Sequence, residues 1–189
     1  FDGYLDAKGV DPESQTETYV AARAYIDNWR WAGVPFLLRT GKELPSRFTS
    51  VDIQFRMPPH ALFGTSEECH LRPNHIRLRI QPHEGIDLGF DVKKPGSGLE
   101  MRAVKMDFGY EEYFHEELAE AYQRLLQDVV NGDQSLFIRS DEVEASWRWV
   151  DDLRTVMEST ELHTYKPQTW GPEAADGLFG ECEGRWSRQ

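Results

Sequence analysis

The sequence contains only two cysteines in 189 residues, Cys69 and Cys182. Two cysteines so far apart exclude a disulfide framework and a structural zinc site, so we expect free thiols and a cytoplasmic, reducing location. The six histidines show no metal-ligand spacing with one another or with Cys69. The sequence therefore predicts no bound metal.

Long apolar runs and basic residues are also scarce. No apolar run approaches the roughly 18 residues that a membrane-spanning helix requires. The 21 Lys and Arg residues are outnumbered by 33 Asp and Glu residues, which gives a formal net charge of -12. Nucleic-acid-binding proteins present a basic face to the phosphate backbone. We therefore expect neither a membrane nor a nucleic acid as a partner.

Glycine-rich phosphate-binding loops are absent as well. No dinucleotide-binding fingerprint occurs, and the "GSG" at residues 96–98 is typical of a hairpin turn. The stretch "RTGKELPSR" is not a P-loop, because Phe36 stands where its first glycine belongs and Glu43 replaces the Ser or Thr that holds magnesium. No pair of carboxylates has a spacing suited to acid–base chemistry. The sequence therefore supplies neither a cofactor-binding loop nor a catalytic base of its own.

The length and the even composition predict one domain, residues 1–189. The chain opens on Phe1 with "FDGYLDAKGV", which has neither the charged nor the apolar region of a signal peptide. We expect that this sequence begins within a longer protein.

Alternating apolar and polar residues predict strands in the first half of the chain. The predicted strands are residues 16–28, 34–39, 50–56, 75–81, 85–92 and 99–108. The strand at 34–39 is entirely apolar up to its arginine and is predicted to be buried on both faces, whereas the later ones should bury one face. The last strand changes its apolar face once, which indicates a β-bulge.

The second half changes to helical periodicity. A helix is predicted over residues 117–130, with Gly132 as its C-terminal cap, and another from Ser140 as N-cap to Met157. A short third helix is expected after Pro172. Strands followed by helices predict an α+β fold, a mostly antiparallel β-sheet with helices packed on one face. The other face either forms a homodimer or is exposed to solvent.

The most cationic turn follows the buried strand. Gly41 is expected to allow a tight turn, from which Lys42 and Arg47 project. A lysine point charge and a planar guanidinium suit a phosphoryl group, and a chain of net charge -12 needs such a local positive site to bind an anion. Two cations in a loop are also compatible with a solvated turn without any ligand.

Several long strings resemble the bacterial-type C-terminal domain of the glucose-6-phosphate 1-dehydrogenase family. They are "SQTETYVAARAYIDNWRWAGVPFLLRTGKELPSR", "LRIQPHEGI", "KKPGSG", "EAYQRLLQDVVNGDQSLFIRSDEVEASWRWVD" and "GPEAADGL". They occur in one order from about residue 3 to residue 180. The resemblance implies a part in oxidising D-glucose 6-phosphate to 6-phosphogluconolactone with NADP, the entry of the pentose phosphate pathway.

The resemblance also implies what this chain lacks. In the family, an N-terminal Rossmann domain binds NADP as co-substrate and carries the histidine–aspartate dyad that abstracts the proton. The motifs of that domain do not occur here, so the catalytic base is expected outside this chain, which should be inactive alone. The residues that the resemblance assigns to the substrate glucose 6-phosphate are Lys42, Arg47 and Gln81.

Some animal members of the family bind a second, structural NADP on this domain. Three positions of that site match here, Arg39, Arg79 and Asp107, whereas others do not: Phe48, Asp52, Asp87, Gly89 and Trp170. Losing cations and gaining Asp makes a phosphate site unfavourable, so we expect no structural NADP, as in bacterial relatives. The resemblance further implies a homo-oligomer, a dimer or a tetramer, formed through the β-sheet.

Two other functions remain compatible with the sequence. The domain could be a non-enzymatic module that assembles through its sheet, with an incidental Lys42–Arg47 turn. It could also be a stand-alone sugar-phosphate binding domain, although two or three contacts leave little to offset the entropy lost on binding.

Overall fold

The computed structural model describes residues 3–57, 72–96, 101–115, 121–180 and 185–187. The chain divides into two compact units, Phe1–Phe114 with His163–Gln189, and His115–Leu162. Both cysteines and the beginnings of the predicted last strand and first helix lie outside the described residues. The assignment of residues 1–189 to a single domain stays a prediction.

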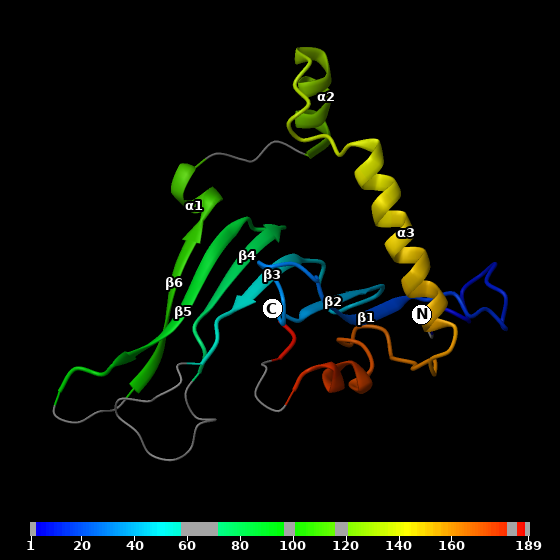
Figure 1. The fold of residues 1–189 in the computed structure, drawn as a ribbon, viewed down its shortest axis with the longest axis horizontal. Coiled ribbons are helices and arrows are strands. Elements are labelled where there is room, and N and C mark those ends of the chain that lie inside the picture. Colours follow the sequence, from blue (N-terminus) through cyan, green and yellow to red (C-terminus); the bar gives the residue numbers. More distant parts are fainter. Residues whose placement is uncertain (1–2, 58–71, 97–100, 116–120, 181–184, 188–189) are drawn as a thin grey trace. The chain divides into compact units, whose positions relative to one another are not determined.

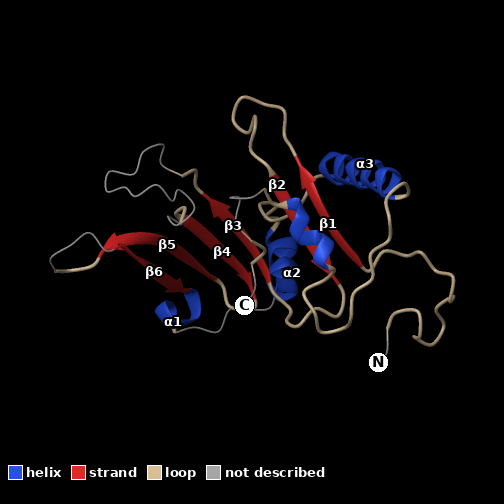
Figure 2. Ribbon diagram, turned by 90° about the horizontal axis from the view of Figure 1, so that it is seen from below, coloured by secondary structure: helices blue, strands red, loops and turns tan. Residues whose placement is uncertain are grey.

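The first unit contains two antiparallel sheets (Figures 1 and 2). One consists of β1 (Tyr19–Ala24) and β2 (Phe36–Gly41), and the other of β3 (Thr49–Gln54), β4 (His75–Gln81), β5 (Gly85–Lys93) and β6 (Met101–Gly109) in that order. The predicted α+β class with antiparallel strands is confirmed. The strands nevertheless form two sheets rather than one, since β2 and β3 follow each other in the chain but do not pair.

The prediction that the strand at residues 34–39 is buried on both faces is wrong. The observed strand β2 pairs only with β1, so one of its edges carries no partner strand in the described part of the chain. Its residues are half-buried or exposed, and Leu38 is clearly exposed. An apolar run therefore lies in a two-stranded ribbon whose burial depends on other segments of the first unit.

The four-stranded sheet has one apolar and one charged face. Rows of directly opposed residues cross all four strands, and one apolar row is Ile53, Ile76, Leu88 and Met106. A charged row on the other face is Asp52, Arg77, Asp87 and Asp107. The period-2 alternation of the sequence is thus confirmed.

The apolar face of β5 was expected to be its buried face, and this prediction is wrong. The most buried residues of β5 are Gly85, Asp87 and Gly89, whereas Ile86 on the apolar face is 41% exposed. The two glycines explain this, because a Cβ at Gly85 would collide with the Arg79 side chain and one at Gly89 with the ring of His75. Side chains of β4 therefore lie across the glycines of β5 and cover Asp87.

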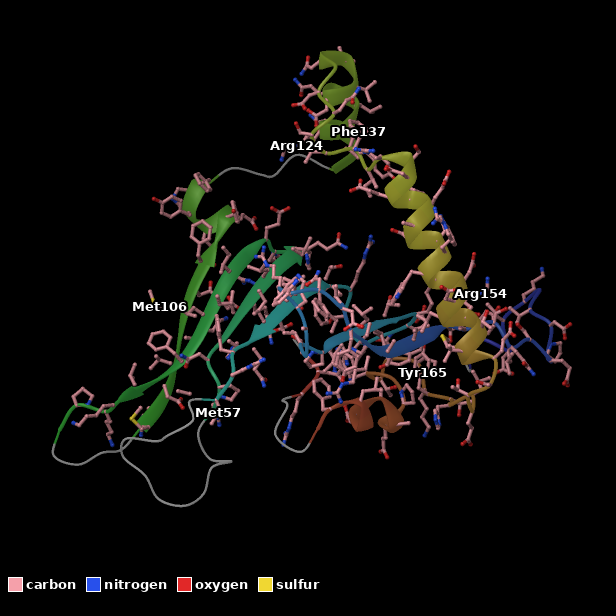
Figure 3. The ribbon with its side chains drawn as sticks, in the orientation of Figure 1. Met57, Met106, Arg124, Phe137, Arg154 and Tyr165 are labelled. Atoms are coloured by element: carbon pink, nitrogen blue, oxygen red, sulfur yellow. The ribbon has the colours of Figure 1, made fainter. Side chains whose placement is uncertain are left out.

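The predicted bulge in the last strand is also wrong. Within the described residues, β5 and β6 pair in regular register from Gly85 opposite Gly109 to Lys93 opposite Met101. Val104 and Met106 share the apolar face, and Met106 projects from β6 with 61% of its surface exposed (Figure 3). The register shift of this sheet lies instead between Thr49 and Ser50, where β3 begins beside β4.

The second unit carries α2 (Ala121–Asn131) and α3 (Ser140–Met157). Gly132 has a φ of 71°, so it caps α2 as predicted. The predicted N-cap of α3 is one residue too late, because Arg139 occupies that position and its backbone N–H donates to Glu142 Oε2 at 3.1 Å. In the first unit, α1 (Tyr110–Phe114) was not predicted, and the 3₁₀ helix η2 (Glu173–Leu178) confirms the short helix after Pro172.

Candidate functional site

The candidate cations Lys42 and Arg47 lie in the connection from β2 to β3. Lys42 directly follows Gly41, the last residue of β2, and both cationic side chains are exposed. Within the described part of the chain, neither charged group takes part in a hydrogen bond or ion pair. The structure thus leaves both cations available to an anion, although no contact joins one to the other.

Gly41 is required for packing rather than for a tight turn. Its backbone has no positive φ, so the predicted reason for this glycine is wrong. A Cβ at this position would lie 2.7 Å from the ring of Tyr19 and 3.3 Å from the side chain of Leu44. The strand before Lys42 therefore packs tightly against the ring of a residue on β1.

Three hydrogen bonds hold the backbone at Lys42 and Glu43. The Lys42 N–H donates to the Thr18 carbonyl at 2.8 Å, and the Lys42 carbonyl accepts from the Tyr165 hydroxyl at 2.8 Å. The Gln168 N–H donates to the Glu43 carbonyl at 2.7 Å. Sequence reasoning missed Tyr165 and Gln168, which lie more than 120 residues further along the chain and carry no local motif.

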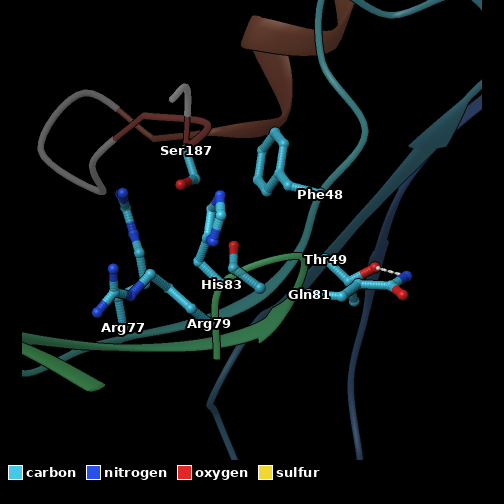
Figure 4. Close-up of a pocket in the computed structure, with 8 residues that line it drawn as sticks. Phe48, Thr49, Arg77, Arg79, Gln81, His83 and Ser187 are labelled. Atoms are coloured by element: carbon cyan, nitrogen blue, oxygen red, sulfur yellow. Dashed lines mark hydrogen bonds between the residues drawn. The ribbon is translucent and has the colours of Figure 1, made fainter. Parts of the chain in front are cut away.

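Gln81 ends β4 opposite Thr49, the first residue of β3. Its Nε2 donates to Thr49 Oγ1 at 3.0 Å, as Figure 4 shows. Because Thr49 follows Arg47 by two residues, the sheet brings Gln81 to the point where the Lys42–Arg47 connection enters β3. No hydrogen bond among the described residues links Gln81 to Lys42 or Arg47.

A small pocket lies beside Gln81 (Figure 4). Its lining consists of Phe48, Thr49, Ser50, Arg77, Arg79, Gln81, His83 and Ser187, and its volume is about 30 Å³. That volume suffices for one or two water molecules but not for a sugar phosphate or a dinucleotide. Its arginines are also neutralised, since Arg77 pairs with Asp52 at 2.7 Å and Arg79 with Asp107 at 3.3 Å.

Four charges form a cluster on the polar face of the large sheet. Asp87, only 3% exposed, lies 3.1 Å from Lys105 Nζ and 3.4 Å from Arg79 Nη2. Both cations also contact Asp107, at 2.9 Å and 3.3 Å. The pKa of Asp107 is lowered from 3.8 to about 2, first by its side-chain hydrogen bond with Asp87 and then by the one from Lys105. The pKa of Lys105 is raised, chiefly by the same bond to Asp107.

The lowered pKa of Asp107 predicts how acid affects stability. A carboxyl with a depressed pKa in the folded state stabilises the fold above its unfolded pKa of about 4, and that contribution is lost as the pH falls toward 2. We expect the free energy of unfolding to fall more steeply between pH 5 and pH 2 in the wild type than in Asp107→Asn, measured by urea titration with tryptophan fluorescence. Asp27→Asn, which alters an exposed carboxyl, is the control and should keep the wild-type slope. Equal slopes for the Asp107→Asn variant and the wild type would contradict the assignment.

Arg39 on β2 is enclosed by residues from the last part of the chain. Its guanidinium lies 5.2 Å from the ring centre of Trp170 and 5.0 Å from that of Trp186. It also donates to the Ser187 carbonyl at 2.6 Å. Burial raises the pKa of the neighbouring Tyr19 hydroxyl, and the charge of Arg39 offsets this only in part. The Arg39 side chain is thus occupied by contacts within the chain.

The described residues contain no helix that is both long and apolar enough to cross a membrane. The same described residues contain no group of three or more His, Cys, Asp or Glu side chains placed to hold a metal ion.

Comparisons with known proteins agree on one family. Residues 1–187 match the family model described as "Glucose-6-phosphate dehydrogenase, C-terminal domain". Glucose-6-phosphate 1-dehydrogenase of Treponema pallidum is 46% identical over 187 residues, which cover 97% of this chain and 36% of that protein. The enzyme of the same name from Aggregatibacter actinomycetemcomitans is also 46% identical, over 98% of this chain and 37% of its own length.

Solved structures show the same relationship. The crystal structure of glucose-6-phosphate 1-dehydrogenase from Mycobacterium avium superposes with a TM-score of 0.81 at 37% identity, over 99% of this chain and 38% of that one. A glucose-6-phosphate dehydrogenase in complex with its substrate glucose-6-phosphate gives 0.84 at 30% identity, over 97% of this chain and 38% of that one. This chain spans between a third and two fifths of the length of these relatives. It belongs to the glucose-6-phosphate dehydrogenase family, in the part that forms the C-terminal domain.

Proposed function

We propose that this chain binds glucose 6-phosphate as the C-terminal domain of an NADP-dependent glucose-6-phosphate dehydrogenase, which yields 6-phosphogluconolactone. The single observation that carries the proposal is the exposed Lys42 directly after β2, whose ammonium has no ion-pair partner among the described residues. In a chain of net charge -12 the overall field repels an anion, so binding an anionic ligand requires a local cation of this kind. The family and the substrate complex of a relative at 30% identity support this choice of ligand.

The chain's own residues bind and orient the substrate. The Lys42 ammonium acts as a point charge toward the phosphoryl group or a ring hydroxyl, and the Arg47 guanidinium offers two N–H donors in one plane. Gln81 contributes a side-chain amide at the point where the same connection enters β3, and its hydrogen bond to Thr49 holds the side chain in place. NADP, bound mainly by the Rossmann domain, supplies the hydride acceptor. Holding the sugar in one orientation toward that acceptor and its base is the contribution of this domain.

The experiment that tests the proposal compares the chain alone with the chain joined behind a Rossmann domain of the family. NADPH formation from glucose 6-phosphate and NADP is followed by absorbance at saturating substrate. We expect turnover from the joined enzyme and none from the chain alone, because the hydride acceptor and base belong to the other domain. Turnover by the chain alone would place a base within it, and a folded but inactive joined enzyme would favour a module without a substrate role.

We also propose that the domain does not bind a structural NADP. Of the three matching positions, Arg39 is enclosed by Trp170 and Trp186, while Arg79 and Asp107 are paired within the charged cluster. A dinucleotide would have to displace these contacts and approach buried Asp87. The residues present therefore do not fit that cofactor.

An oligomer formed through the sheet is part of the proposal. The apolar face of the four-stranded sheet is exposed in rows, and its exposed residues include Val51, Ile53, Ile80, Ile86, Val104 and Met106. A contiguous apolar surface of this kind is typical of an interaction surface. This observation also keeps a role as an assembly module open. A cytoplasmic location and the absence of membrane and nucleic-acid partners stay predictions from composition.

A further inference from the structure

The backbone of Lys42 is held by a hydroxyl from a distant segment. The Tyr165 Oη lies 2.8 Å from the Lys42 carbonyl and 3.1 Å from the Thr18 carbonyl, the group that accepts the Lys42 N–H. One hydroxyl thus bridges the end of β2 and the residue before β1. The Tyr165 ring, labelled in Figure 3, packs against the ring of Tyr19 on β1, with ring centres 5.3 Å apart, and this contact helps to fix the position of its hydroxyl.

The backbone of Glu43, the residue after Lys42, is held by a hydrogen bond from Gln168, which lies in the same distant segment as Tyr165. Glu43 and Gln168 both have left-handed backbone conformations, with φ of 48° and 60°. Non-glycine residues adopt this conformation at an energetic cost and keep it where the surroundings hold them. Here the Gln168 N–H donates to the Glu43 carbonyl at 2.7 Å. The hydrogen bond thus joins two residues of left-handed backbone, one of which, Glu43, directly follows Lys42.

These two backbone hydrogen bonds matter for substrate binding because lysine has a long, flexible side chain. Its ammonium group reaches a phosphoryl oxygen reproducibly only when the backbone that carries it is fixed. The backbone carbonyls of Lys42 and Glu43 accept these hydrogen bonds, and the Lys42 side chain stays exposed. We propose that Tyr165 and Gln168 are positioning residues that hold Lys42 for glucose 6-phosphate, an inference that rests on the proposed function.

A double-mutant cycle in the joined enzyme tests the role of Tyr165. Tyr165→Phe keeps the ring and removes the hydroxyl, so we expect the KM for glucose 6-phosphate to rise about fivefold to tenfold while kcat changes less than threefold. In a Lys42→Ala background the same substitution should change the KM less than twofold, because the residue it positions is gone. Tyr25→Phe is the control, since Tyr25 is 58% exposed and no hydrogen bond of its hydroxyl occurs among the described residues.

A second pair of variants tests Gln168 without depending on Tyr165. Gln168→Gly suits the left-handed backbone and retains the N–H bond to Glu43, so its KM should stay within twofold of the wild type. Gln168→Val places a β-branched residue at a positive φ and should raise the KM severalfold. Thermal melting of each variant establishes that it is folded at the assay temperature. Equal KM values for the two Gln168 variants would overturn the role of this residue.

The outcomes separate this inference from the proposed function. If Lys42→Ala leaves the KM unchanged, the substrate role of Lys42 fails. If Lys42→Ala raises the KM but Tyr165→Phe does not, only the positioning role fails. An equal effect of Tyr165→Phe in both backgrounds would show that its hydroxyl acts on the fold in general and would overturn the inference.

Discussion

Replacing Lys42 with alanine in the joined enzyme should raise the KM for glucose 6-phosphate about 100-fold. If Lys42 binds the phosphoryl group as proposed, the substitution removes a charge-assisted hydrogen bond, which is worth about 1.5–3 kcal/mol. Initial rates over a range of glucose 6-phosphate concentrations at fixed NADP give the measurement.

Two further variants test whether the effect of Lys42→Ala comes from the loss of the charge at this site. Lys42→Arg keeps the charge but changes its geometry, so part of the affinity should return. Lys8→Ala removes another exposed lysine and serves as the control for net charge, with an expected change in KM of less than twofold. A rise in KM as large for Lys8→Ala as for Lys42→Ala would show that the global charge, rather than this site, governs binding.

Replacing Asp87 with alanine should destabilise the chain by about 3 kcal/mol. The substitution removes a buried carboxylate and leaves Arg79 and Lys105 with Asp107 as their only remaining partner in the cluster. Breaking a buried ion pair by removing one partner is strongly destabilising, and here the exposure of Lys105 moderates the loss. Urea denaturation of the chain at neutral pH, followed by tryptophan fluorescence, measures the change in unfolding free energy.

Asp52→Ala is the matched control for Asp87. Asp52 lies in the same row of the sheet and pairs with Arg77 at 2.7 Å, but both side chains are about a third exposed. Exposed ion pairs contribute up to about 1 kcal/mol, so this variant should remain close to the wild type. Equal losses in the two variants would indicate that burial of Asp87 does not determine its contribution.

The sheet shows how far periodicity carries a prediction. The alternation in β3, β4 and β5 correctly predicted the strands, because side-chain direction follows local backbone geometry. It did not predict that β5 buries Gly85, Asp87 and Gly89, since that depends on Arg79 and His75 lying across the strand. The C-terminal cap of α2 was predicted correctly at Gly132, because capping depends on local sequence, whereas the N-cap of α3 was placed one residue too late.

In the candidate site too, residues in local patterns were predicted from the sequence, whereas long-range contacts were not. Lys42 and Arg47 were found from a local pattern of glycine and cations and from the family resemblance. Tyr165 contacts Lys42 across 123 residues of sequence, and a tyrosine in a loop carries no signal of such a contact. Arg39 was noted for a cofactor position, yet its enclosure by Trp170 and Trp186 required the structure.

The long sequence separation between β2 and the segment that encloses it has a consequence for synthesis on the ribosome. Arg39 bonds to Ser187, 148 residues later, so the strand β2, which ends at Gly41, emerges from the ribosome long before this partner does. Contacts of such high sequence separation form slowly, and a nascent chain exposes the apolar residues that they would cover. The connection from β2 to β3, which carries Lys42, is therefore among the last parts of the first unit to reach its final form.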